Sequence, residues 1–241
     1  MRSAHAVVGT YEGPWDEPSV AAWARTLRGQ LAAPSVSLGV LFVSPQFAAP
    51  WDSLLETLRL EARIPLLVGS TAAGGTSGGL ELPDASGFVL ALYDLPGARL
   101  RAVHVRDEDL ERISEPSDCH RFTGVEPAAS RGWMIFADPF QTNNEAWLRA
   151  WNQAYPGIPI VGGLATGIAE ERSCTLFLDG TVHHEGTVAV SVGGGAAILP
   201  VISQGCRPIG EPWTITGRNG ISSWGSAIAP PTRCWWRPTT A

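Results

Sequence analysis

The segment VLFVSP at residues 40–45 returns as MIFADP at 134–139, and IPLLVG at 64–69 returns as IPIVGG at 158–163. Both matches have the same offset, since 134 − 40 = 94 and 158 − 64 = 94, so the alignment needs no gap. A self-match of this kind predicts a duplicated supersecondary unit. Two such units that face each other form a cleft, and clefts of this type often bind small ligands.

Each copy has the pattern of a strand, a helix and a second strand. An apolar run ends at a proline, an amphipathic stretch follows, and a short second apolar run leads into glycines. This order predicts two parallel strands joined by a helical crossover. The expected elements are 37–43, 50–60 and 65–68 in the first copy and 133–137, 143–154 and 158–161 in the second. A further helix is expected at 16–31, where apolar residues recur at helical spacing.

Turn-forming residues predict that each copy ends in a β-hairpin. In the first copy the turn is Asp94-Leu95-Pro96-Gly97, and another short hairpin is expected around Asp179-Gly180. The expected hairpin strands are 87–93 and 98–106, 175–178 and 181–184, and 186–192 and 196–203. The predicted fold is therefore α/β, with a duplicated βαβ-plus-β-hairpin unit (repeats 37–106 and 131–204) forming mixed sheets covered by helices.

Composition excludes several classes of protein. The 241 residues carry a net charge of −6 with no block of Lys and Arg, so neither nucleic acid nor an anionic membrane is an expected partner. No apolar stretch reaches the ~18 residues that span a bilayer, and residues 1–11 lack the apolar core of a signal peptide. The four isolated cysteines fit reduced thiols in the cytoplasm. No zinc or nucleotide motif is present, so we expect no metal or cofactor.

The composition changes after Asn219. Residues 220–241 contain three tryptophans and three prolines but no Asp, Glu, Lys or Leu, and they follow neither a helix nor a strand period. Back-translation with GC-rich codons and a shift of one base turns the segment from Ile221 into HLELGIGHRPADALLVAADD, which has the apolar period of a helix. We interpret 220–241 as an aberrant, unstructured tail produced by a frameshift after a module at 1–219. A natural Trp/Pro-rich tail is the alternative.

Glycine-rich segments follow the second strand of each copy. Gly69, Ser70 and Thr71 open the first, and Gly162 and Gly163 open the second. Glycines at such a place let the backbone approach a ligand, although they also serve as plain turns. No lysine occupies the position that a phosphate-binding P-loop requires. We therefore take both segments as candidate ligand-binding loops.

Asp138 ends the first strand of the second copy. The carboxyl ends of parallel strands face the binding crevice of an open α/β sheet, so this carboxylate is placed to receive an ammonium or a hydroxyl group. The competing interpretation is an aspartate that caps the next helix or orders its own turn.

The most unusual string is QGCRPIGEP at 204–212. Arg207 offers a guanidinium that can hold a carboxylate through two hydrogen bonds, with Gln204, Cys206 and Glu211 beside it. An Arg207–Glu211 ion pair that holds an irregular loop is the alternative. Cys206 as a nucleophile would need a nearby histidine base, and no His spacing identifies one.

His183 and His184 follow the Asp179-Gly180 turn. Adjacent residues of a strand point to opposite faces, so these two imidazoles are not expected to share a metal ion. We interpret them as exposed residues flanking a turn.

Four segments together resemble the FIST domain: GSTAAGG at 69–75, IFADPF at 135–140, AYPGIPIVGGLATG at 154–167 and, most specifically, ISQGCRPIGEPWTIT at 202–216. The resemblance covers residues 5–219 and points to the N-terminal FIST module. It implies a sensor of small ligands without established enzymatic activity, of the kind found in bacterial signalling proteins and some eukaryotic F-box proteins. A complete member is expected to continue beyond Asn219 into a C-terminal module, which favours the frameshift.

The expected function is non-catalytic binding of a small polar metabolite, such as an amino acid, in signal transduction. In this hypothesis Arg207 holds the carboxylate, Asp138 holds the ammonium, and the loops at Gly69 and Gly163 close on the ligand. An enzyme that uses Cys206 or a carboxylate is one alternative, and a protein-interaction scaffold like the F-box relatives is the other.

Overall fold

The computed structural model describes residues 5–73, 75–77, 80–82, 87–167, 174–203, 205, 218–219 and 222–223, with only the backbone described at 75–82 and 218–223. The chain divides into two compact units, Met1–Pro200 and Val201–Ala241. In its described part the second unit contains two short paired strands, β13 (Arg218–Asn219) and β14 (Ser222–Ser223). The predicted tail at 220–241 otherwise lies outside the described residues.

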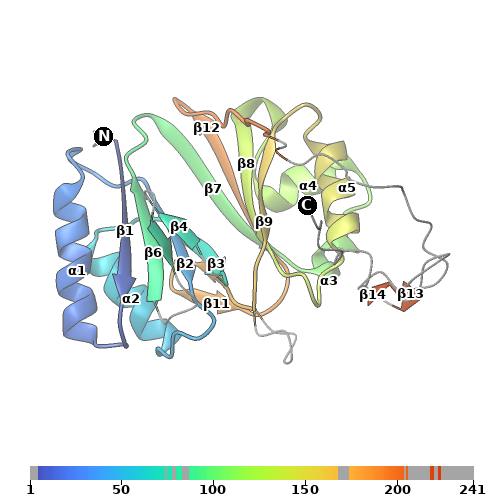
Figure 1. Cartoon of the computed structure of the whole chain (residues 1–241). Coiled ribbons are helices and arrows are strands. Elements are labelled where there is room, and N and C mark those ends of the chain that lie inside the picture. The colour runs from blue at the N-terminus through green and yellow to red at the C-terminus, as the bar shows by residue number, and fades with distance from the viewer. Residues whose placement is uncertain are drawn as a thin grey trace, which may run out of the picture. The chain divides into compact units, whose positions relative to one another are not determined.

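The first unit contains two mixed sheets (Figure 1). The larger has the order β1-β6-β2-β3-β10-β11 and the smaller the order β7-β12-β8-β9. In the larger sheet the strands are β1 (Ala6–Glu12), β2 (Leu38–Val43), β3 (Leu67–Thr71), β6 (Gly87–Tyr93), β10 (Leu176–Leu178) and β11 (Thr181–His183). In the smaller they are β7 (Ala98–Val105), β8 (Ser130–Ala137), β9 (Ile160–Leu164) and β12 (Thr187–Gly194), and β4 (Gly75–Ser77) and β5 (Leu80–Leu82) form a separate hairpin. The two predicted crossovers give the parallel pairs β2–β3 and β8–β9.

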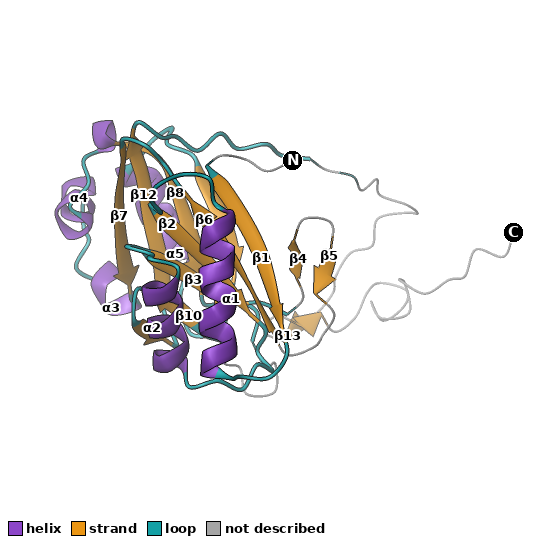
Figure 2. Cartoon of the chain, turned by 90° about the vertical axis from the view of Figure 1, so that its left-hand side faces the viewer, coloured by secondary structure: helices purple, strands orange, loops and turns teal. Residues whose placement is uncertain are grey.

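Helices cover the outer face of each sheet, and the two inner faces pack together. Figure 2 shows α1 (Glu17–Gln30) and α2 (Trp51–Glu61) lying across the larger sheet. The smaller sheet carries α3 (Asp107–Leu110), α4 (Pro116–Thr123), a short turn η1 (Pro127–Ala129) and α5 (Asn144–Ala154). Between the sheets, Val40 and Val68 share a core with Phe136, Val188 and Val190. This arrangement of helix, sheet, sheet and helix confirms the predicted α/β class.

The repeated unit is longer than the sequence indicated. Strands β1, β6, β2 and β3 pair in the same order and with the same directions as β7, β12, β8 and β9. Each copy therefore begins at β1 or β7, ahead of the predicted starts at 37 and 131. The added strand was missed because the β1 and β7 sequences share no motif that a self-comparison detects.

The pairing of strands corrects the alignment of the two copies by one residue. Gly69 lies opposite Leu41, and Gly162 lies opposite Ile135, the counterpart of Leu41. The segment between strand and helix is 44–50 in the first copy and one residue shorter, 138–143, in the second. Gly69 therefore corresponds to Gly162, and its predicted match with Gly163 is wrong.

Both corresponding glycines are required by a close approach of the backbone. A Cβ atom on Gly69 would lie 1.8 Å from the Leu41 carbonyl oxygen, and one on Gly162 would lie 2.0 Å from the Ile135 carbonyl oxygen. Only glycine fits at such a separation. By contrast, a Cβ atom on Gly163 would meet no other atom within 4 Å.

The predicted hairpins at the end of each copy are wrong. The residues Asp94–Gly97 do form a turn, with the Ala98 N–H donating to the Leu95 carbonyl, but β6 and β7 belong to different sheets. The turn is therefore the crossing from one copy to the next. In the second copy, residues 196–203 form no strand after β12. The short hairpin around Asp179-Gly180 is confirmed as β10 and β11.

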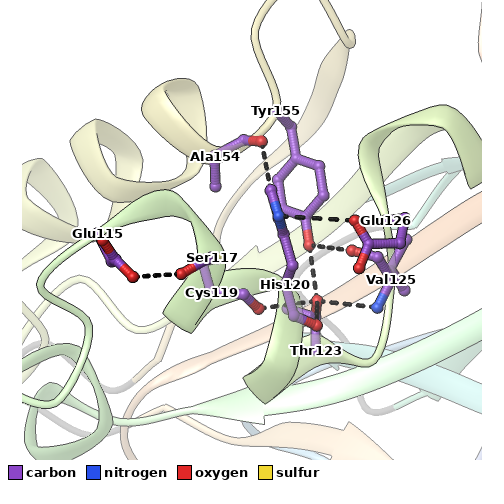
Figure 3. A network of polar contacts seen from close by, with 9 residues as sticks. All are labelled: Glu115, Ser117, Cys119, His120, Thr123, Val125, Glu126, Ala154 and Tyr155. Atoms are coloured by element: carbon purple, nitrogen blue, oxygen red, sulfur yellow. Dashed lines mark hydrogen bonds and ion pairs between the residues drawn. The ribbon is translucent and has the colours of Figure 1, made fainter.

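A buried polar network fixes α4 against α5 (Figure 3). The Tyr155 hydroxyl donates to the Val125 carbonyl at 3.0 Å and lies 2.6 Å from the Thr123 hydroxyl. A ring nitrogen of His120 lies 2.8 Å from the Ala154 carbonyl. Burial raises the pKa of Tyr155, so its hydroxyl stays protonated as a donor. These contacts hold Phe122, on α4, at the edge of the pocket described below.

We expect Gly162→Ala to lower the free energy of unfolding by about 2–3 kcal/mol, because the added methyl group collides with the Ile135 carbonyl. Gly163→Ala is the matched control and is expected to change it by less than about 1 kcal/mol. Urea denaturation of both variants measures the difference. Equal losses in the two variants would contradict the corrected alignment.

Candidate functional site

A hollow of about 730 Å³ lies where the β10–β11 hairpin of the larger sheet meets the end of β7 in the smaller sheet. It sits at the carboxyl end of β7, beside the segment that follows the carboxyl end of β8. The hollow lies at the carboxyl ends of β7 and β8, the kind of position at which the sequence predicted a site, but its lining residues all belong to the second copy, so it is not the predicted cleft between the two copies. We call it the histidine pocket. Its lining comprises His104, Arg106, Asp109, Phe122, Gln141, Val182, His183, His184 and Glu185.

Two imidazole rings stack in this pocket although they are far apart in sequence. His104 lies on β7, and its neighbours Val103 and Val105 face the helices, so His104 faces the other sheet. His183 ends β11 opposite Leu176, which also belongs to the core between the sheets. The ring centroids are 3.8 Å apart, and the ring planes differ by 20°.

The two histidines differ in their hydrogen bonds. A ring nitrogen of His104 lies 2.8 Å from the Glu185 carbonyl, which holds that ring in place. The Nε2 atom of His183 is buried and has no hydrogen-bond partner among the described residues. A buried polar atom of this kind is costly unless a ligand or water satisfies it.

The surroundings of His183 disfavour its protonated form. Burial is the main cause, and together with electrostatic contributions from His104, His184 and Arg106 it lowers the pKa of His183 to about 4. His183 is therefore a neutral imidazole at physiological pH. Of the groups that lower this pKa, Arg106 carries a permanent positive charge, which also attracts an anion.

Arg106 supplies the permanent positive charge of the pocket. Its guanidinium lies 3.6 Å from both Glu108 and Asp109, and its side chain is 43% exposed. Asp109 is already engaged, because it accepts a hydrogen bond from the Arg106 N–H at the start of α3. Contacts of 3.6 Å at an exposed position are weak, so the guanidinium is free to turn toward a ligand.

Loop contacts close the floor of the pocket. The Gln141 side-chain amide donates to the His184 carbonyl at 3.1 Å. A Cβ atom on Gly186, which has φ = +86°, would lie 2.5 Å from the His104 ring and 2.4 Å from the Val105 carbonyl. Glycine at 186 therefore lets the 184–186 segment pass directly beneath His104.

Asp138 has the structural role that the sequence left as the alternative. Its side chain is fully buried and accepts hydrogen bonds from the N–H groups of Phe140 and Gln141 and from the hydroxyl of Thr142. The thiol of Cys174 donates to it as well, at 3.2 Å. With these hydrogen bonds from within the protein, Asp138 orders the turn before α5, which is the alternative interpretation of the sequence.

The predicted glycine loop at residues 69–71 is a buried strand. Gly69, Ser70 and Thr71 form the carboxyl half of β3, between β2 and β10, and the Thr71 N–H donates to the Thr175 carbonyl. Gly162 and Gly163 lie within β9 and are exposed. None of the five residues lines the histidine pocket.

The other predicted site residues, Gln204, Cys206, Arg207 and Glu211, lie outside the described residues. The residues that line the pocket were missed because His104 and Arg106 lie within the expected strand 98–106, where no pattern marks them as site residues, and because His183 was interpreted as an exposed residue flanking a turn. His184 is exposed as predicted, whereas His183 is partly buried. The adjacent residues His183 and His184 next to an Asp-Gly turn were the only sequence signal for this pocket. Nothing in the sequence identified His104 as the residue that stacks on His183.

The described cysteines are poor nucleophiles. Burial raises the pKa of the Cys119 thiol to about 11 and, together with the neighbouring Asp138 carboxylate, raises that of Cys174 to about 12. Both remain thiols at neutral pH. Within the described part of the chain, no group of three or more His, Cys, Asp or Glu side chains could hold a metal ion.

A family model for the FIST N domain matches residues 37–220. This chain belongs to the FIST N domain family. The match confirms the resemblance seen in the sequence, and it ends where the composition changes. The FIST domain family is associated with sensing in signal transduction.

Curated relatives of this FIST N domain chain occur in mycobacteria. The uncharacterized protein Rv0628c of Mycobacterium tuberculosis is 29% identical over 215 residues, covering 88% of this chain and 54% of the relative. The uncharacterized protein Mb0898c of Mycobacterium bovis is 30% identical over 195 residues, covering 80% of this chain and 48% of the relative. The chain thus spans about half the length of the curated relatives that it matches. Among its described helices, none has the length and hydropathy needed to cross a membrane.

We expect the FIST N domain to lose stability as the pH falls from about 6.5 to 4. In the unfolded chain His183 takes up a proton near pH 6.5, whereas in the folded protein it does so only near pH 4. The stabilising contribution of neutral His183 is therefore complete above pH 6.5 and is lost as the pH falls through this window. Melting temperatures measured at intervals between pH 7.5 and 4 test this.

Two variants isolate the contribution of His183 from that of other titrating groups. His183→Gln should flatten the decline of the melting temperature, whereas His184→Gln, on the exposed neighbour, should keep the parental slope. If the melting temperature of His183→Gln fell with pH as steeply as that of the parent, the acid sensitivity would have to come from other titrating groups.

Proposed function

We propose that this FIST N domain is a non-catalytic sensory module that binds a small carboxylate-bearing metabolite, such as an amino acid, in the histidine pocket. The observation that carries the proposal is the buried, unpartnered Nε2 atom of His183 beside the Arg106 guanidinium. A carboxylate oxygen can accept a hydrogen bond from the imidazole in the tautomer with its proton on Nε2.

Arg106 takes the role that the sequence analysis gave to Arg207. A guanidinium can bind a carboxylate through two parallel hydrogen bonds, and such charge-assisted bonds are stronger than neutral ones. Because the contacts of Arg106 with Glu108 and Asp109 are long, a ligand carboxylate competes with them at low cost.

The opposite charge of an amino acid also finds a partner in the pocket. Glu185 is an exposed residue of the lining, and its carboxylate can receive an ammonium group. A pocket lined by a guanidinium, an imidazole and a carboxylate matches the charge pattern of a zwitterion. Carboxylic acids without an ammonium group are the next class to expect.

A binding role fits the chemistry of the described residues better than a covalent one. The thiols of Cys119 and Cys174 are buried and uncharged, and neither lines the pocket. Free cysteines also fit a reducing compartment, so we place the sensor and its ligand in the cytoplasm as part of the proposal.

A thermal-shift panel of amino acids and small carboxylic acids at millimolar concentration tests the proposal. A ligand present at 100 times its Kd stabilises the folded protein by about 2.7 kcal/mol, which gives a clear rise in melting temperature. Isothermal titration of the best compound then gives its Kd. No stabilisation by any amino acid or carboxylic acid would overturn the proposal.

Arg106→Gln should weaken the binding of that compound by at least about tenfold, because a hydrogen bond to a charged group contributes about 1.5–3 kcal/mol. Arg99→Gln is the matched control: it removes the same charge from an exposed position of β7, the strand that ends just before Arg106, and Arg99 does not line the pocket. Equal affinities of the two variants would place the ligand somewhere other than the histidine pocket.

A further inference from the structure

The two copies of the repeat contain the same small hairpin in the same place. In each copy the hairpin lies between the second strand of the parallel pair and the last strand: β4–β5 follows β3, and β10–β11 follows β9. Each strand has three residues, and two residues separate the strands of each hairpin. The cross-strand partners also correspond, because Thr76 pairs with Glu81 as Phe177 pairs with Val182.

The hairpin of the second copy completes the sheet of the first. Strand β10 lies antiparallel along the outer edge of β3, with Phe177 opposite Gly69. At both ends of this pairing the backbone bonds continue: the Thr71 N–H donates to the Thr175 carbonyl, and the Asp179 N–H donates to the Leu67 carbonyl. The outward-facing backbone groups of β3 are therefore satisfied by β10.

The corresponding edge of β9 lacks such a partner in the part of the chain that the structure describes. Since the Trp133 N–H donates to Pro159 and the Ala165 N–H donates to Ala137, the alternate residues Ile160, Gly162 and Leu164 direct their backbone groups outward. Gly162 and Gly163 are exposed, and Leu164 is 60% exposed. An open edge of this kind is a template for another strand.

The hairpin of the first copy lies within reach of this edge. The Thr166 N–H donates to the Thr71 carbonyl at 3.1 Å, so β3 and β9 meet at their carboxyl ends. Strand β4 begins four residues after Thr71, a span of up to about 14 Å at 3.3–3.6 Å per residue. Strand β4 also lies against β1, just as β10 lies against β7, the counterpart of β1.

We propose that the outer edge of β9 is a strand-addition site for β4 of the same chain. Each copy of the repeat then completes the sheet of the other copy, and the smaller sheet acquires the order β7-β12-β8-β9-β4-β5. The correspondence fixes the register: Gly162 pairs with Thr76 as Gly69 pairs with Phe177, so Val161 lies opposite Ser77. This inference is independent of the proposed ligand, because it concerns only the pairing of backbone groups.

Disulfide trapping in the 241-residue chain tests the register. Val161→Cys combined with Ser77→Cys places two thiols on directly opposed residues, at a separation suited to a disulfide. The control pair, Leu164→Cys with Ser77→Cys, is three residues out of register. Both double-cysteine variants also carry Cys206→Ser and Cys234→Ser, while the buried Cys119 and Cys174 are retained.

Under mild oxidation the first pair should form an intramolecular disulfide about tenfold faster than the control pair, as judged by mass spectrometry of the monomer. Equal rates in the two pairs would overturn the proposal. Predominant cross-linking between two chains would overturn it as well, because it would assign the edge to a second copy.

Hydrogen exchange gives an independent test that needs no new cysteine. In a hairpin with a two-residue turn, Thr76 directs its N–H and carbonyl away from β5 and toward the added strand. Thr76→Pro therefore removes a donor to β9 and leaves the β4–β5 bonds in place. The Gly162 amide should exchange slowly in the parent and about tenfold faster in Thr76→Pro. Fast exchange in the parent, or no change in the variant, would contradict the proposal.

Discussion

The packing of the two sheets against each other is the interaction on which the rest of this structure depends. Val40 and Val68 from one copy and Val188 and Val190 from the other are all buried in a single apolar layer. Neither copy buries this face alone, since its helices cover only the opposite side of its sheet. The hydrophobic effect therefore favours the pair of copies over either one, and it brings the edges and loops of one sheet against the other.

This packing explains which features could be predicted from the sequence. The strands around Phe42 and Phe136 were found because most of their residues on both faces are buried or half-buried, with Phe42 itself an exposed exception, which leaves a largely apolar run. Helices α2 and α5 were found because they bury one apolar stripe each. The duplication was visible for the same reason: equivalent strands in equivalent layers select similar residues.

The incorrect predictions arose where a short sequence pattern is compatible with two different structures. The residues Asp94–Gly97 form a turn, but turn chemistry does not reveal that the strands on either side enter different sheets. Asp138 follows a strand at the expected place, but its type does not reveal that loop N–H groups and the Cys174 thiol donate to its carboxylate. The stacking of His104 on His183 depends on the β10–β11 hairpin of the second copy joining the sheet of the first copy. The hydrophobic periodicity of the sequence gives no indication that this hairpin joins the other sheet.

The duplication also allows the residues of the histidine pocket to be compared with their described counterparts in the first copy. Val89 and Val188 are counterparts, because they lie opposite Phe42 and Phe136 in equivalent strands. The residue opposite Val89 on β1 is Thr10, whereas the residue opposite Val188 on β7 is His104. Two residues further along each strand, Glu12 stands where the second copy has Arg106. At these two positions the first copy has no imidazole and carries a negative charge in place of a positive one. The two copies thus share one backbone geometry but differ in the side chains at this edge of the sheets.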